Sequence, residues 1–474
     1  MQVMSILRFV MLHASLLFVL AGCARYEARP LSPGQTAEQF EARTLDDPQL
    51  KAFIQANLKR DLVAWPLREW DFDTLTLTAL FYHPSLDVAR AQWAVAQAGV
   101  KTAGGRPNPV ANVAPQYTSN SESGVSPWIA ALTLDTTIET AGKRGYRIER
   151  ARQESESARL KLAEQAWQVR SRLRARLLDY AAADRRVALL QRVQDVQQQS
   201  LQLLEGRLAA GEIAAIELTT ARVALIKTQT DLADAQRQAV ESRAGVAEAL
   251  GVPLRALPTS FKFQISNFEV GTDLESVQVR QRALHSRADI LAALADYAAS
   301  QSALQLEIAR QYPDIHLGPG YEFDQGLHKW GLSVGADLPV LNRNEGPIAE
   351  AQAKRTQAAA QFLALQAQVL AEIDRALAAR AASQEQLRRI DSLLDTQRRH
   401  VQSVEAMVQA GAADQLELSS ARLEVAVTEV ARLDAMIKAQ QALGQLEDAV
   451  QVPLDALPSV EQNPRAEAGK EKKP

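Results

Sequence analysis

The chain has 474 residues, of which 47% are hydrophobic and 23% are charged, with a formal net charge of −3. This composition excludes a disordered chain and a bundle of membrane helices, and the balanced charge offers no basic surface for nucleic acid. Aromatic residues make up only 5%, which together with abundant alanine, leucine, glutamine, glutamate and arginine favours long helices. The single cysteine excludes an intrachain disulfide and a multi-cysteine metal site.

The first residues have the pattern of a secretory signal. An apolar run from Phe9 to Leu20 is shorter than the roughly 20 residues of a membrane-spanning helix. It ends in Leu-Ala-Gly before Cys23, which resembles the bacterial lipobox, where the cysteine is lipidated after cleavage. We therefore expect residues 1–22 to be a signal peptide and Cys23 to carry acyl chains. Ala24 stands where lipoproteins of the inner membrane carry aspartate, so it indicates the outer membrane.

The rest of the chain consists of two copies of one unit about 200 residues long. Residues 251–258 read Gly-Val-Pro-Leu-Arg-Ala-Leu-Pro, and residues 451–458 read Gln-Val-Pro-Leu-Asp-Ala-Leu-Pro. The pair Ala210-Gly211 likewise recurs as Ala410-Gly411. The domains expected from this repeat are a lipid-anchored segment 23–73, a first repeat 74–258, an inter-repeat segment 259–273, a second repeat 274–458 and a disordered tail 459–474.

Each repeat begins with a helix and a strand hairpin. We predict a helix over Leu75–Ala103 that tolerates Pro84 near its start, followed by a break at the glycines and prolines of residues 104–109. Val110–Tyr117 and Trp128–Ile138 flank a polar loop, and apolar and polar residues alternate along the second run, as in a strand. The second copy repeats this alternation from Trp330 to Leu338.

A very long helix follows each hairpin. The 68 residues from Lys143 to Ala210 contain no proline and would span about 100 Å. Apolar residues recur at heptad spacing, which predicts supercoiling against neighbouring helices. The seam residues are Val187, Leu190, Leu201, Leu204 and Leu208 in the first copy, and Leu387, Ile390, Leu394, Val401, Val404 and Val408 in the second.

Glycines end both long helices. Gly211 and Gly411 mark turns, after which a shorter helix returns over about Ile213–Leu250 and Ala413–Val450. The opening and returning helices of one repeat, placed end to end, match the length of its long helix. Each repeat is therefore expected to form a layer two helices wide with a strand hairpin at one end.

These features resemble the TolC-type outer-membrane efflux duct family over about residues 70–460. The resemblance implies a mostly α fold with a small β part, in which a homotrimer closes a 12-stranded outer-membrane β-barrel that continues as a periplasmic α-helical barrel. It also implies three kinds of partner: outer-membrane lipid, a periplasmic adaptor and an inner-membrane pump, for which we expect the RND type. Residues 138–145 and 338–346 further resemble the strand-to-helix turns of the lipoprotein branch that serves heavy-metal resistance pumps.

The resemblance assigns roles to strand residues. Leu132, Leu134, Leu332 and Val334 are expected to face lipid. Thr133, Asp135, Ser333 and Asp337 are expected to face the lumen or neighbouring protein.

The resemblance also places an aperture at the two glycine turns. Gly211, Gly411, Glu217, Asp414 and Glu417 are the expected tip residues. Glu212 and Asp414 are explained by the helix dipole, whereas Glu417, which we place two turns into its helix, stands where related ducts have an acid ring. The aperture arginine of one related duct has no evident counterpart, because Ala413 follows the glycine.

No catalytic or cofactor-binding motif is present: there is no Gly-x-Ser-x-Gly, phosphate-binding glycine loop or His-Glu-x-x-His, and the six histidines are scattered. We therefore predict no enzyme, cofactor or tight metal site. His83 and His285 occupy matching places that favour packing or capping. The alternate arginines from Arg170 to Arg176 are interpreted as a solvated face or as intersubunit partners.

Two other functions stay open on the sequence alone. One is an exit duct for protein secretion of type I. The other is a lipid-anchored structural coiled coil of the envelope, which would explain Cys23 and the heptads but not four alternating strand segments.

Overall fold

A computed structural model of the chain describes residues 26–59, 61–62, 64–119, 124–257 and 276–453. The predictions for Cys23, the inter-repeat segment 259–273 and the tail 459–474 lie outside these residues. The chain divides into two compact units. The first, residues 1–44, contains helix α2 (Pro33–Glu41), in which a proline occupies the first turn. The second begins at Leu45 and is described below.

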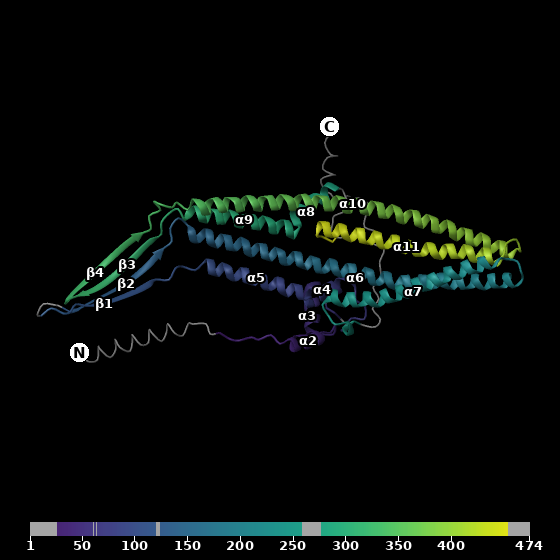
Figure 1. The fold of residues 1–474 in the computed structure, drawn as a ribbon, viewed down its shortest axis with the longest axis horizontal. Helices are drawn as coiled ribbons and strands as arrows, with labels where there is room; N and C mark the ends of the chain where they lie inside the picture. Colours follow the sequence, from purple (N-terminus) through teal and green to yellow (C-terminus); the bar gives the residue numbers. More distant parts are fainter. Residues whose placement is uncertain (1–25, 60, 63, 120–123, 258–275, 454–474) are drawn as a thin grey trace, which may run out of the picture. The chain divides into compact units, whose positions relative to one another are not determined.

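The second unit repeats one order of elements (Figure 1). It opens with α3 (Pro48–Leu58). The first copy then contains α4 (Phe72–Tyr82), α5 (Pro84–Ala103), β1 (Val110–Tyr117), β2 (Trp128–Ile138), α6 (Lys143–Ala209), α7 (Ala215–Leu250) and the short 3-10 helix η1 (Leu254–Ala256). The second contains α8 (Ser276–Ser286), α9 (Ala288–Ala309), β3 (Ile315–Asp324), β4 (Leu327–Ala336), α10 (Glu345–Gln409) and α11 (Gln415–Val450).

The long helices and their shorter partners are confirmed. In Figure 1, α5 and α7 follow one another along α6, and α9 and α11 follow one another along α10. Helix α6 also contacts α9 and α11, so it joins the two copies. The sheet lies at one end of these helices and the two glycine turns lie at the other. The part of the chain that the structure describes contains no helix long and apolar enough to cross a membrane.

The single helix predicted over Leu75–Ala103 is wrong, because the chain breaks between α4 and α5 at His83. This residue is extended, with φ −70° and ψ 121°. Pro84 disfavours helical angles at the residue before it, so Pro84 becomes the first residue of a new helix. The His83 side chain accepts a hydrogen bond from the backbone N–H of Ser85, which confirms capping.

The expected match between His83 and His285 is also wrong. His285 lies in the last turn of α8, whereas the residue that precedes α9 as His83 precedes α5 is Arg287. The buried Arg287 guanidinium donates to the carbonyl of Ala449 at 2.8 Å and pairs with Asp289 at 2.6 Å. The two copies thus join their short helices with different chemistry.

The main hydrophobic core of the first copy lies where its short helices meet α6. Leu75, Leu173, Leu177 and Leu250 are fully buried there. Helix α3, which precedes the first repeat, adds Leu50 and Ile54, which are also fully buried, so this helix belongs to the core. The second copy has a matching cluster around Ile290, Val369, Ile373 and Leu446.

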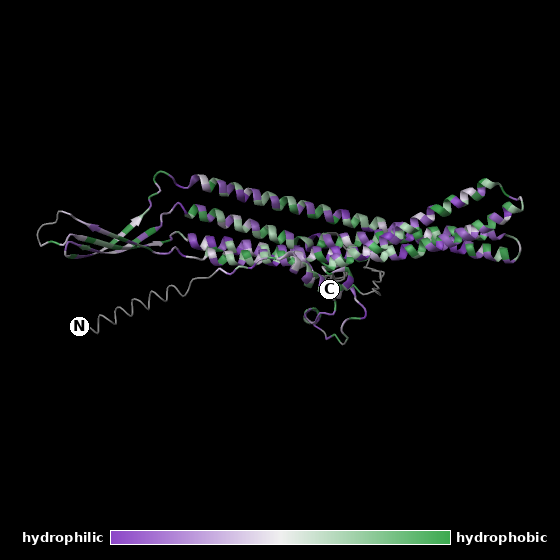
Figure 2. Cartoon of the chain, turned by 60° about the horizontal axis from the view of Figure 1, so that its bottom comes forward, coloured by the Kyte–Doolittle hydropathy of each residue, from purple (hydrophilic) through white to green (hydrophobic). Residues whose placement is uncertain are grey.

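The four strands form one antiparallel sheet in the order β1-β2-β3-β4. The predicted strands of the first copy are confirmed. In the second copy the last strand ends at Ala336 rather than near Leu338, because Pro339 cannot donate to a strand ladder. Asp337 therefore follows the strand. In Figure 2, hydrophobic and hydrophilic residues alternate along the strands.

Helices α6 and α11 meet in a seam rich in ion pairs, which we call the in-chain seam. Arg207 and Asp414 lie 2.6 Å apart near the glycine turns, and Arg186 pairs with Asp434 further along. The seam also includes Arg192 with Glu429 at 3.6 Å, and a hydrogen bond of 2.6 Å between the hydroxyls of Ser200 and Ser419.

The far end of the in-chain seam corrects the interpretation of Arg170 and Arg174, whereas Arg172 and Arg176 are exposed, as expected of a solvated face. Arg170 and Arg174 are largely covered and approach Glu447 of α11 in the same chain. Beside them the Asp448 carboxylate accepts from the Trp167 indole at 3.0 Å and from Ser171 at 2.5 Å. Burial raises the pKa of the Asp448 carboxyl. These arginines join the two repeats of one chain.

Gly251, which follows α7, offers a test of the close packing between the end of α7 and the end of α4. Gly251 and Gly211 both adopt positive φ, of 75° and 77°. A β-carbon at Gly251 would lie 2.8 Å from the carbonyl oxygen of Tyr82, whereas one at Gly211 would meet open space. We expect Gly211→Ala to cost about 1–2 kcal/mol from the backbone conformation, and Gly251→Ala roughly 1–3 kcal/mol more from overpacking. Thermal unfolding of the purified variants measures the difference, and equal melting temperatures would contradict the close packing.

Candidate functional site

The sheet places the predicted strand residues on two chemically distinct faces. Leu132 lies opposite Val113 of β1 and Tyr321 of β3. Leu332 and Val334 lie opposite Pro319 and Leu317, which share the face of Tyr321. Leu134 follows Leu132 by two residues and is on this face as well. The sheet thus has one largely apolar face, which carries all four residues predicted to meet lipid; that they contact lipid stays a prediction.

The opposite face is polar. Thr133 lies opposite Asn112 and Gly320, and Ser333 lies opposite Gly318. Asp135 projects from the same face, and its Oδ1 lies 3.3 Å from Nδ1 of His316 on β3. Within the described residues, no group of three or more His, Cys, Asp or Glu side chains is placed to hold a metal ion. This face is therefore hydrophilic, in contrast to the face that carries Leu132 and Leu332.

Aromatic side chains gather on the apolar face near the hairpin loops. The rings of Tyr117 and Trp128 lie 5.1 Å apart, and those of Tyr321 and Trp330 lie 4.9 Å apart. His328 stacks against Tyr321. Sequence analysis did not assign these residues, although the tyrosine and the tryptophan of each hairpin recur between the repeats. Such a cluster is typical of the interface between membrane and water.

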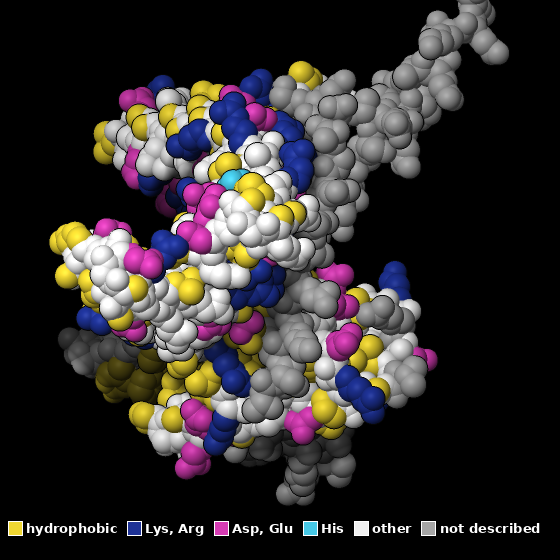
Figure 3. Space-filling model, turned by 90° about the vertical axis from the view of Figure 1, so that its right-hand side faces the viewer, with side chains coloured by type: hydrophobic (Ala, Val, Ile, Leu, Met, Phe, Trp, Pro, Cys, Tyr) yellow, Lys and Arg dark blue, Asp and Glu magenta, His cyan; other side chains and the backbone are white. Residues whose placement is uncertain are grey.

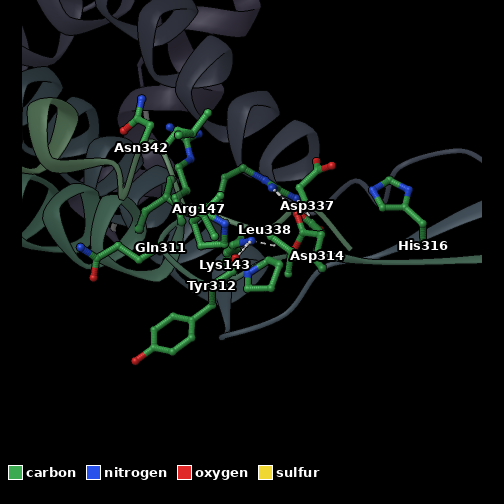
Figure 4. A pocket seen from close by; sticks show the side chains of 16 residues that line it. Lys143, Arg147, Gln311, Tyr312, Asp314, His316, Asp337, Leu338 and Asn342 are labelled. Atoms are coloured by element: carbon green, nitrogen blue, oxygen red, sulfur yellow. Dashed lines mark hydrogen bonds and ion pairs between the residues drawn. The ribbon is translucent and has the colours of Figure 1, made fainter. Parts of the chain in front are cut away.

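The sheet joins the helices through a partly buried ionic cluster, in which Lys143 is buried (Figure 4). The Lys143 ammonium donates to the carbonyl of Tyr312 and to Asp314, both at 2.7 Å. Burial alone would raise the pKa of Asp314, but hydrogen bonds from Lys143 and from the backbone of Thr140 lower it. Arg147 pairs with Glu139 at 2.6 Å. Lys143 and Arg147 are thus neutralised where strand β2 turns into α6.

A pocket of about 630 Å³ opens beside this cluster and lies next to the turn into α10. Its wall combines Lys143, Arg147 and Asp314 with the apolar Leu338 and Leu341, of which Leu341 is 99% exposed. Because its buried lysine is already paired, the pocket offers no free buried cation for a ligand. The structural role assigned to these turns from the sequence agrees with this geometry.

At the opposite end, both long helices end alike. Gly211 and Gly411 adopt left-handed angles, with φ 77° and 72°. The N–H of the following residue, Glu212 or Ala412, bonds back to the carbonyl of Arg207 or Met407, which is the Schellman motif. The returning helices begin at Ala215 and Gln415, two residues later than predicted.

Asp414 and Glu417 occupy the start of α11. Asp414 is the N-cap and accepts from the backbone N–H groups of Leu416 and Glu417, at 2.7 and 2.8 Å. These bonds and the Arg207 guanidinium lower the pKa of Asp414. Glu417 therefore lies in the first turn, not two turns in as expected. Its side chain is exposed, like those of Glu212 and Glu217.

Sequence reasoning missed Arg207, the arginine that pairs with the tip acids. Arg207 precedes the glycine turn of the first repeat. It lies 4.0 Å from Glu212 of that turn and 2.6 Å from Asp414, which belongs to the second repeat. Comparing the repeats would have singled it out, because Met407 stands at the matching place. Figure 3 looks onto this end, where charged and hydrophobic side chains intermingle.

Comparisons with known proteins agree with this architecture. A family model described as outer membrane efflux protein matches residues 77–252 and 279–450. These two stretches make up most of the chain, so the protein belongs to the outer membrane efflux protein family. One match falls in each structural repeat, and the mostly α fold with a small β part is confirmed.

Individual relatives add detail. Cobalt-zinc-cadmium resistance protein CzcC of Cupriavidus metallidurans is 26% identical over 233 residues, which are 49% of this chain and 55% of CzcC. The match thus spans about half of each protein. A crystal structure of CusC has a TM-score of 0.67 at 19% identity and covers 83% of this chain and 95% of CusC. VceC of Vibrio cholerae has a TM-score of 0.65 at 20% identity, covering 81% and 96%.

The two sheet faces generate a test in adjacent residues. Arginine at Leu332 is expected to cost about 2–4 kcal/mol if this position lies at the bilayer midplane, and less near an interface. The neighbouring variant Ser333→Arg is expected to fold normally and to alter ion conductance. Folding into lipid vesicles and single-channel recording distinguish the two. The reverse pattern would mean that the register is shifted by one residue.

Proposed function

We propose that this chain is the outer-membrane exit duct of a tripartite efflux system. The observation that carries the proposal is a four-stranded sheet with one apolar and one polar face, continuous with two layers of very long helices. In lipid every backbone polar group must be paired, so a sheet there has to close without edges. Strand β4 of one copy would pair with β1 of the next, and three copies would form a 12-stranded barrel.

In this proposal the duct is passive. The polar sheet face lines a water-filled lumen, and the chain catalyses no reaction. An inner-membrane pump of the RND type drives transport, and a periplasmic adaptor connects it to the tips formed by the glycine turns. The similarity to CzcC over about half of either protein supports divalent metal cations as cargo. Weak contacts suit this role, because conduction requires that ions leave as readily as they enter.

The proposal is tested by deleting the gene in its own host and measuring cell-associated cobalt, zinc and cadmium after metal challenge. We expect metal to accumulate and the wild-type gene to restore efflux. If other toxic compounds accumulate and the metals do not, the proposal that metal cations are the cargo is contradicted. Unchanged levels of every compound would overturn the duct.

We further propose that Arg207 and Asp414 hold the closed tip together. Asp414→Asn removes the charge but keeps a side-chain oxygen that caps α11, whereas Asp414→Ala removes both. We expect both variants to raise the resting conductance in planar bilayers, and Glu417→Ala to weaken cation selectivity while leaving the resting conductance low. Equal resting conductance in wild type and Asp414→Asn would contradict the role of the pair.

The lowered pKa of Asp414 sets the pH dependence of this pair. The charged Asp414 carboxylate stabilises the ion pair fully above the ordinary aspartate pKa of 3.8. This stabilisation is lost only as the pH falls through the lowered pKa of Asp414. The resting conductance is therefore expected to be constant between pH 5 and 8. A rise as the pH falls from 7 to 5 would assign closure to other groups.

Lipid attachment at Cys23 is proposed from the lipobox alone. Cys23→Ser is expected to abolish labelling by radioactive palmitate, because the acylated thiol is removed. The trimeric barrel would still hold the protein in the membrane, so conductance is expected to persist. Undiminished labelling of Cys23→Ser would show that the lipobox interpretation is wrong.

A further inference from the structure

The helix columns leave two faces open at opposite edges. Helices α6 and α11 lie between α7 and α10, so α7 and α10 each have one neighbour fewer than the inner columns. On α7, exposed residues recur at intervals of three and four, and the same is true of α10. They include Thr219, Val223, Ile226 and Val240 on α7, and Leu393, Thr396, His400, Ser403 and Met407 on α10.

These open faces are the repeat counterparts of the in-chain seam. The repeat offset of 200 residues relates α7 to α11 and α6 to α10. Ser419 and Ala426 on α11 are 6% and 8% exposed, because α6 covers them. Their counterparts Thr219 and Ile226 on α7 are exposed, Ile226 by 61%. The same sequence positions are thus covered inside the chain and uncovered at its edges.

We infer that α10 of one copy packs against α7 of the next in the register of the in-chain seam. This inference rests on the proposed trimer and specifies its contacts. The in-chain contact between Ser200 and Ser419 becomes His400 against Thr219 of the partner subunit. One heptad further from the tip, Leu393 meets Ile226 of the partner subunit. Because the two faces differ and lie on opposite edges, the contact is head to tail and closes into a ring.

Charges distinguish this seam from the one inside the chain. The in-chain pairs Arg192–Glu429 and Arg207–Asp414 correspond to Ser392 with Gln229 and to Met407 with Ala214, which carry no opposite charges.

Conversely, Leu189 and Ala431 correspond to Arg389 and Asp231. Both are exposed; Arg389 pairs with Glu385 one turn away on its own helix at 2.8 Å, and Asp231 has no ion pair with any described residue of its own chain. Arg389 therefore faces Asp231 of the partner subunit. The charged positions of the two seams differ, so α10 cannot replace α6 in the contact with α11 without losing ion pairs. The two repeats therefore alternate in a fixed order around the ring.

Paired cysteines test the register, since the natural chain has a single cysteine at position 23. Two variants are in register: His400→Cys with Thr219→Cys, and Leu393→Cys with Ile226→Cys. Exchanging partners gives two matched controls, His400→Cys with Ile226→Cys and Leu393→Cys with Thr219→Cys, each displaced by about 10 Å along the helix. Under mild oxidation in membranes, the in-register variants are expected to form covalent dimers and trimers on denaturing gels, and the exchanged variants are not.

Ser200→Cys with Ser419→Cys serves as the positive control, because this pair should oxidise within one chain and shift mobility without adding mass. Light scattering of each variant in detergent reports the number of chains. A trimer in which only the exchanged pairs cross-link, or in which no pair except the control does, would overturn the register and leave the proposed duct intact. A monomer would overturn the trimer as well.

Discussion

In the proposed duct, one constraint governs the rest of the structure: every backbone group of a sheet in lipid must be paired. One chain supplies four strands, whose outer members β1 and β4 have no further strand within the described residues. Closure through other copies follows from this requirement. Each strand pair leads directly into a long helix, and the ionic cluster around Lys143 and Asp314 ties the start of α6 to the residues that precede β3.

The duplicated sequence provides two kinds of helix contact from one pattern. Within the chain, α6 and α11 are joined by ion pairs that run from the largely covered Arg174 and Glu447 to the more exposed Arg207 and Asp414. The corresponding faces of α10 and α7 are mostly uncharged and open. A chain of two similar but unequal repeats can therefore build a ring with two kinds of seam, each held by its own chemistry.

Local patterns predicted most of the architecture. Heptad spacing, the two glycine turns and the alternation around Leu132 and Leu332 each depend on neighbours in sequence, and the structure confirms the elements that they predicted. What failed depends on distant partners. Arg170 pairs with Glu447 and Arg207 pairs with Asp414, each more than 200 residues away, so no local pattern identified these contacts. The break at His83 was predictable from Pro84 but was outweighed by the helical composition around it.

The central claim is that copies of this chain close into one continuous duct. End-on class averages of the detergent-solubilised protein, obtained by electron cryomicroscopy, test it most directly. The account predicts a hollow ring with three-fold symmetry and 12 helical columns, four from each chain. Averages that show a single chain, a two-fold dimer or a filled bundle would contradict it.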